Sequence, residues 1–104
     1  MRAPIVGEEA LAPWSDDGFL YPCVLVDVHE ETADIVFLDG SLACMAVGEL
    51  RAVRLGAGSQ PEVNWRGGGT FYGGTILRRR GLAVLVHFDD GTREWSTVAQ
   101  CRVR

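Results

Sequence analysis

An internal repeat with a fixed spacing of 51 residues constrains the fold of this chain more than any other feature. When residues 8–53 are placed on residues 59–104, eight positions are identical and no gap is needed. Six of the eight pairs are aromatic, acidic or glycine residues, so the retained pattern indicates a site together with its turns. The pairs are Trp14 and Trp65, Gly18 and Gly69, Tyr21 and Tyr72, Phe37 and Phe88, Asp39 and Asp90, Gly40 and Gly91, Val47 and Val98, and Arg51 and Arg102.

Each repeat is about 50 residues long, which is close to the lower limit for a domain that folds alone. The two repeats of this 104-residue chain predict two small domains, residues 1–55 and residues 62–104, and their small size predicts that they support each other. The segment between them, residues 56–61, has the composition Gly-Ala-Gly-Ser-Gln-Pro and is predicted to be a short flexible linker.

Short runs of aromatic and β-branched residues between tight-turn sequences predict an all-β fold. Asp-Gly at residues 17–18, 39–40 and 90–91 marks turns, because glycine adopts positive φ freely. The predicted strands of the first repeat are 10–14, 19–28, 33–38, 42–46 and 51–55, with a helical turn at 47–50. Those of the second repeat are 63–65, 71–77, 82–88, 92–96 and 101–104.

Five short strands in each repeat predict a small antiparallel barrel, because closure removes exposed strand edges. The expected fold is therefore two tandem five-stranded barrels. A single ten-stranded sandwich and an exchange of strands between the repeats are the alternatives.

The net charge of -4 is unevenly distributed: residues 1–58 carry -7 and residues 59–104 carry +3. The acidic half is expected to attract a cationic partner. No apolar run approaches the ~20 residues that span a bilayer, and residues 1–4 do not begin a secretory segment. We therefore expect an intracellular, soluble protein without a membrane partner, nuclear if the source is eukaryotic and cytoplasmic if it is bacterial.

The sequence contains no pattern typical of catalysis, of a metal site or of a cofactor. The three cysteines form no Cys-x-x-Cys pair, and neither His29 nor His87 has a partner at ligand or triad spacing. The glycine-rich residues 66–74 lack the Gly-Lys-Ser/Thr ending of a nucleotide loop. We expect no enzyme activity, no metal site and no cofactor.

The retained aromatic residues predict a binding site in each repeat. Side chains two apart on a strand share a face, and a hairpin closed at residues 15–19 brings the rings on either side of it together. Three aromatic walls and one carboxylate are expected at the open end of each barrel. These are Trp14, Tyr21, Phe37 and Asp39 in the first repeat, and Trp65, Tyr72, Phe88 and Asp90 in the second.

Such a box suits a methylated ammonium group. Ring faces attract the cation, whereas an unmodified lysine must give up a strongly hydrated head group to enter. The carboxylate adds a charge-assisted hydrogen bond to any remaining N–H.

The same residues resemble Tudor domains of the Royal superfamily. The resemblance lies in Trp14 to Cys23 with Ile35 to Gly40, and in Trp65 to Tyr72 with Val86 to Gly91. It implies two SH3-like barrels that bind methylated lysine or arginine through aromatic cages, with the eight residues above as cage residues. Many such readers have a further aromatic residue two positions after the aspartate, where this chain has Ser41 and Thr92.

The leading hypothesis is therefore a non-catalytic reader of a methylated basic peptide, possibly a histone tail, with the acidic first repeat favoured if one repeat binds alone. One alternative is nucleic-acid binding through Arg78, Arg79 and Arg80 and the other arginines of the second repeat. The other alternative is a structural adaptor that docks onto another protein without recognising methyl groups.

Overall fold

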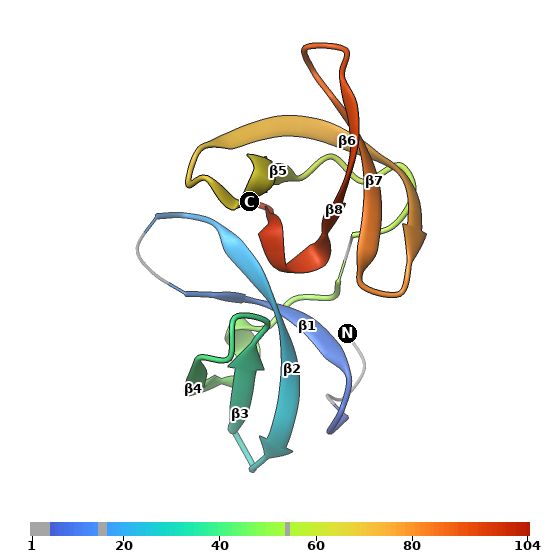
Figure 1. The fold of residues 1–104 in the computed structure, drawn as a ribbon. Helices are drawn as coiled ribbons and strands as arrows, with labels where there is room; N and C mark the ends of the chain where they lie inside the picture. The colour runs from blue at the N-terminus through green and yellow to red at the C-terminus, as the bar shows by residue number, and fades with distance from the viewer. Residues whose placement is uncertain (1–4, 15–16, 54) are drawn as a thin grey trace. The chain divides into compact units, whose positions relative to one another are not determined.

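The computed structural model describes residues 5–14, 17–53 and 55–104. It separates the chain into two compact units, with the division directly after Val53 and with Arg104 grouped with the first unit. Regular structure in the described residues consists of nine β-strands and three short 3₁₀ turns (Figure 1). None of the helical segments found there is long and apolar enough to cross a membrane. The predicted all-β fold is confirmed.

The first unit is a four-stranded antiparallel sheet in the order β1-β2-β3-β4. Its strands are β1 (Glu9–Pro13), β2 (Leu20–Val28), β3 (Thr32–Phe37) and β4 (Leu42–Ala46), followed by the 3₁₀ turn η1 (Val47–Glu49). These strands were all predicted. Ser15 and Asp16 of the predicted first turn lie outside the described residues.

A fifth strand was predicted at residues 51–55. Residues 51–53 and 55 are described, and they do not form a strand. Arg51 forms only an isolated bridge to Leu11, with backbone N···O distances of 2.8 and 2.9 Å. No further pairing with β1 follows Arg51 in the described residues, and the chain passes into the second unit after Val53.

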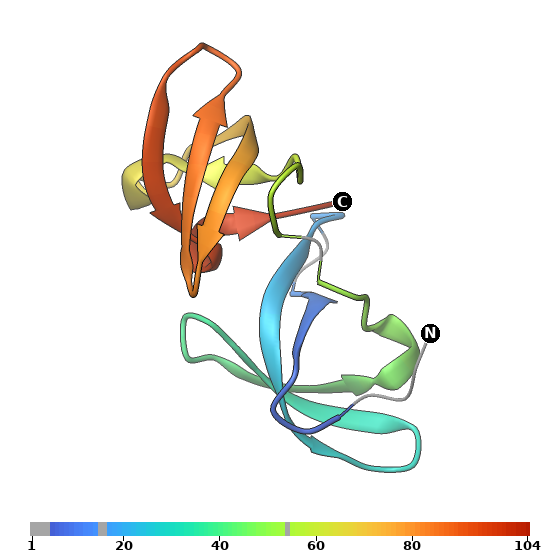
Figure 2. The same cartoon turned by 90° about the vertical axis from the view of Figure 1, so that its right-hand side faces the viewer.

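The second unit contains the five strands that were predicted, in the order β8-β7-β6-β5-β9. Figure 2 shows β6, β7 and β8 side by side. The strands are β5 (Glu62–Asn64), β6 (Phe71–Arg80), β7 (Ala83–Phe88), β8 (Arg93–Thr97) and β9 (Cys101–Arg102), with 3₁₀ turns η2 (Trp65–Gly67) and η3 (Val98–Gln100). Both units are barrel-like, although neither sheet closes into a full barrel within the described residues.

The two units repeat the same backbone plan in the register that the sequence repeat defines. β3 and β7, β4 and β8, and η1 and η3 each occupy positions 51 residues apart. A β-bulge also recurs, between Leu25 and Asp27 in β2 and between Ile76 and Arg78 in β6. The retained turn glycines Gly40 and Gly91 have φ values of 96° and 95°, a conformation that residues with a Cβ rarely adopt.

Each unit buries alternate residues of its strands in a small apolar core. In the first unit the core includes Cys23, Leu25, Ala33, Ile35 and Phe37. In the second unit, Val63, Ile76, Val84, Val86, Phe88, Val98 and Cys101 are buried. The cores therefore reach the ends of β3 and β7, directly beneath the predicted binding residues.

Residues 56–61, which composition predicts to be a linker, pack against their own unit. The Gly58 N–H donates to the Ile76 carbonyl and the Ile76 N–H donates to the Ser59 carbonyl, both at 2.8 Å. Pro61 is fully buried. The segment thus lies along β6. The predicted domain boundaries, 1–55 and 62–104, stay a prediction.

Candidate functional site

The three aromatic residues predicted in the first unit come together. Trp14 follows β1, Tyr21 lies in β2 opposite Ala12, and Phe37 ends β3. The rings of Trp14 and Tyr21 are 5.4 Å apart at 87°, whereas Trp14 stacks on Phe37 at 5.1 Å and 18°. Phe37 is buried, so Trp14 covers the end of the core and leaves its other face toward solvent.

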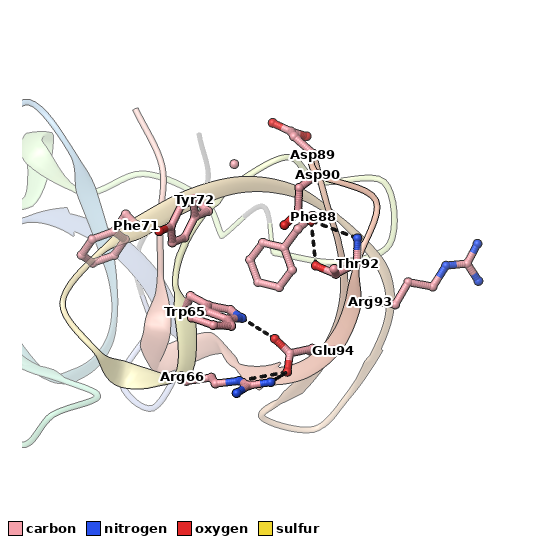
Figure 3. A pocket seen from close by; sticks show the side chains of 11 residues that line it. Trp65, Arg66, Phe71, Tyr72, Phe88, Asp89, Asp90, Thr92, Arg93 and Glu94 are labelled. Carbon is pink, nitrogen blue, oxygen red and sulfur yellow. Dashed lines mark hydrogen bonds and ion pairs between the residues drawn. The ribbon is translucent and has the colours of Figure 1, made fainter.

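The corresponding residues of the second unit surround a pocket of about 750 Å³. Trp65 begins η2, Tyr72 lies in β6 opposite Val63, and Phe88 ends β7. The Trp65 and Tyr72 rings are 6.2 Å apart at 88°, and both are exposed, at 40% and 49%. Figure 3 shows the Trp65 and Phe88 side chains pointing toward each other with Tyr72 beside them. Phe88 itself is buried and forms the base of the pocket.

The two aromatic sets therefore differ in one respect that matters for binding. Trp14 lies flat on Phe37, but the described part of the second unit has no matching stack of Trp65 on Phe88. The wider separation of Trp65 from Tyr72 keeps space between their rings. Sequence identity between the repeats did not reveal this difference, because the residue types are the same.

The two predicted carboxylates bond to their own turns. Asp39 accepts hydrogen bonds from the Ser41 N–H and hydroxyl at 2.8 and 2.9 Å. Asp90 accepts the equivalent bonds from Thr92 at 2.9 and 2.7 Å. The backbone N–H, and then the hydroxyl, lower the pKa of each carboxyl below its usual value. Asp90 nevertheless lies on the wall of the large pocket, so the structure joins it to the aromatic set of the second unit.

The carboxylate in direct contact with an aromatic wall is Glu94 of β8, which the sequence analysis missed. Its Oε2 accepts a hydrogen bond from the Trp65 indole N–H. Its Oε1 accepts bonds from Nε and Nη2 of Arg66 at 3.1 and 2.8 Å. Both partners lower the pKa of Glu94, with Arg66 as the larger cause. The chain therefore fixes the indole edge through a charged hydrogen bond.

The cage residues were predicted from the residues that both repeats share. Glu94 is not among them, because the first repeat has Ala43 at this position. Ala43 packs against the core of the first unit. Glu94 of β8 pairs with the buried Val86, so it faces inward, and a carboxylate at an inward position of a strand was the signal that would have found it.

The charges around the large pocket favour a cation. Asp89, Asp90 and Glu94 line it, together with Arg66 and Arg93. Arg66 is paired with Glu94, and its guanidinium lies 4.6 Å from the centroid of the Trp65 ring. The Arg93 side chain extends away from the pocket (Figure 3). Three carboxylates against two arginines give the pocket lining a net negative charge, which favours a cation.

The arginines that suggested nucleic-acid binding are engaged in several separate contacts. Arg102 pairs with Glu62 at 3.0 Å and lies 3.7 Å from the centroid of the Phe71 ring. Arg79 donates to the Gly81 carbonyl at 2.8 Å, and the Arg80 guanidinium lies over Trp95. These contacts do not favour a single basic surface for phosphates.

Comparison with known proteins adds little to this geometry. No protein-family model matches the sequence, and no curated protein matches it. Among solved structures, the chain is similar to the crystal structure of Arabidopsis thaliana AGDP1 AGD34, with 10% identity and a TM-score of 0.47. The match covers 95% of this chain and 81% of that chain.

Proposed function

We propose that the chain is a non-catalytic binding module whose second unit receives a methylated lysine or arginine of a basic peptide. One observation carries the proposal. Trp65 and Tyr72, both largely exposed, stand at 88° to each other on a pocket of about 750 Å³, with Phe88 at its base. A histone tail is one peptide of this chemical kind.

The physical basis is the attraction between a cation and the faces of aromatic rings. Each ring contributes about 0.5–1 kcal/mol when exposed and about 2 kcal/mol when desolvated. A methylated head group loses less hydration on entering such a pocket than an ammonium does. The neighbouring Asp89 and Asp90 add attraction for the cation and for other basic residues of the peptide.

Glu94 and Arg66 support this site by holding Trp65 in place. The Glu94 carboxylate bonds to the indole N–H, and Arg66 bonds to the same carboxylate. A ring held in advance loses less conformational freedom on binding, so more of the contact energy appears as affinity. The proposed binding residues are Trp65, Tyr72 and Phe88 with Asp90, and Glu94 acts as a positioning residue.

The first unit is proposed as the weaker of two sites. Trp14, Tyr21 and Phe37 meet there, but stacking of Trp14 on Phe37 fills the space between these two rings. Both oxygens of Asp39 are bonded to Ser41. This order differs from the expectation based on charge, which favoured the acidic first repeat.

The three tryptophans allow a direct test by NMR, because each indole N–H gives its own signal. The protein is titrated with one basic peptide carrying an unmodified, monomethyl, dimethyl or trimethyl lysine, and with a dimethylarginine peptide. We expect the Trp65 indole signal to shift with methylated peptides and the Trp95 signal to stay unchanged. Substitution of each tryptophan by phenylalanine assigns the signals.

The proposal fails if no signal shifts at millimolar peptide. It also fails if the unmodified peptide shifts the Trp65 indole signal as strongly as the methylated ones, because the ring faces would then select only for positive charge.

A further inference from the structure

A second candidate site lies on the first unit, where three strands place metal-binding side chains in one row. Asp27 of β2 pairs with Asp34 of β3, and Asp34 pairs with Cys44 of β4. Ala33 and Ile35, which flank Asp34, are buried in the core, so Asp34 faces outward. Cys44 is exposed and lies opposite Asp34 in the register of β3 and β4. The row therefore lies on the solvent side of the sheet.

The β-bulge at Val26 creates this row. Leu25 pairs with Ile35 and the next pair is Asp27 with Asp34, so Val26 is an extra residue. Without the bulge, Asp27 would continue the inward alternation of Cys23 and Leu25. With the bulge, Asp27 is exposed and Val28 packs against the core instead.

His29, just after β2, completes the cluster. Its Nε2 lies 3.2 Å from Oδ2 of Asp34. The ligand atoms of Asp27, His29 and Asp34 all lie within 4.8 Å of one another. Ligands of a tetrahedral zinc ion are about 3.3–3.7 Å apart. These side chains are exposed or half-buried, so they are not held at their present spacing by core packing.

The donor set and the surrounding charge both suit a divalent transition metal. Imidazole nitrogen, thiolate sulfur and carboxylate oxygen are the ligands that zinc takes in proteins. Glu30 and Glu31 follow His29 at the tip of the same hairpin, and both are exposed. They add negative potential, which raises the local concentration of cations.

The second unit provides an internal comparison, because it has the same strands and the same bulge without the ligands. The residues at the equivalent positions are Arg78, Arg80, Leu85 and Trp95. Arg78 pairs with Leu85, and Leu85 pairs with Trp95, in the same register. The Arg80 guanidinium lies 6.0 Å from the centroid of the Trp95 ring. The backbone therefore does not require the donor set of the first unit.

We propose that Asp27, His29 and Asp34 form a zinc-binding site on the outer face of the first unit, with Cys44 of the neighbouring strand as the fourth ligand. The imidazole binds in its neutral form and both aspartates as carboxylates. The Cys44 thiol gives its proton to solvent when the sulfur binds the ion. This inference is independent of the methyl-binding pocket, which lies in the second unit.

The test is calorimetric titration of the tag-free protein with zinc chloride. We expect one zinc ion per chain. Changes to groups beside metal ligands commonly weaken binding by about 10–100-fold. Loss of a ligand in His29→Ala or Asp34→Asn is therefore expected to weaken zinc at least about tenfold. The matched control is His87→Ala, which removes the other histidine of the chain and leaves zinc binding unchanged.

Cobalt binding tests the thiolate. A cobalt complex of the unaltered protein is expected to show a sulfur-to-metal charge-transfer band in the near ultraviolet, which Cys44→Ser abolishes. Burial raises the pKa of Cys23 to about 11 and of Cys101 to about 12, so these thiols do not replace Cys44. Heteronuclear NMR spectra of the variants check that the fold is kept.

Three results overturn the proposal. One is the absence of zinc binding at millimolar metal. Another is binding that survives in both His29→Ala and Asp34→Asn. The last is that Cys44→Ser has the same cobalt spectrum and the same zinc affinity as the unaltered protein.

Discussion

Replacing Tyr72 by alanine tests the proposed pocket most sharply, because it removes one wall with little damage to the fold. The ring is 49% exposed and forms an edge contact with Trp65. A cation–π contact contributes about 0.5–1 kcal/mol to the binding free energy when the ring is exposed and about 2 kcal/mol when it is desolvated. The contribution of the Tyr72 ring is expected to lie between these values. A loss of about 1–2 kcal/mol corresponds to affinity weakened about 5–30-fold.

Trp95→Ala is the matched control for Tyr72→Ala. Trp95 is also about half exposed and belongs to the same unit, but it does not line the pocket of about 750 Å³. It lines an adjoining pocket of about 260 Å³ that shares Trp65, Arg66, Phe88 and Glu94 with the first. Calorimetry with a trimethyllysine peptide should show weaker binding only for Tyr72→Ala.

A second peptide carries the neutral carbon isostere of trimethyllysine and separates cation attraction from apolar contact. We expect Tyr72→Ala to weaken binding of this neutral peptide much less. An equal loss for the charged and the neutral peptide would refute the cation argument, and an equal loss in Trp95→Ala would refute the location of the site.

Two further predictions concern stability. A Cβ at Gly74 would lie 2.7 Å from Cγ1 of Val86 and 3.1 Å from the His87 carbonyl oxygen, so Gly74→Ala should destabilise the second unit by about 1–3 kcal/mol in urea unfolding. Gly73→Ala, which meets only the end of the Asp89 side chain, should cost less. The lowered pKa of Glu94 predicts a stability contribution that is full above its unfolded pKa of about 4.3 and is lost as pH falls through the folded pKa. Arg66→Ala should flatten this acid dependence, measured by unfolding across pH, and an unchanged slope would contradict the assignment.

The repeat was sufficient to predict the strands because it carries both the apolar alternation and the turns. Gly40 and Gly91 occupy equivalent turns at nearly equal φ, and β3 and β7 begin and end at equivalent positions. The strand predicted at 51–55 was wrong because its length depends on where the chain leaves the first unit, and local propensity does not contain that information.

The arrangement of the predicted side chains was less predictable than the strands, because side-chain positions depend on tertiary contacts. The aromatic residues converge in each unit, but the stacking of Trp14 on Phe37 and the open arrangement at Trp65 were not distinguishable from residue types. Glu94 was missed because it differs between the repeats. The Asp27 and His29 cluster was missed because a one-residue bulge changes which side chains share a face.

The exposure of the retained rings separates a structural explanation of the repeat from a functional one. Phe37 and Phe88 are buried, so packing alone accounts for their retention. Trp14 and Trp65 are 49% and 40% exposed, and a ring left in water contributes far less to stability than a buried one. The two copies share only eight residues, and both tryptophans are among them. Trp14 also packs on Phe37, but the described part of the second unit shows no matching stack, so a ligand that covers both indoles, as proposed above, would explain why both are retained.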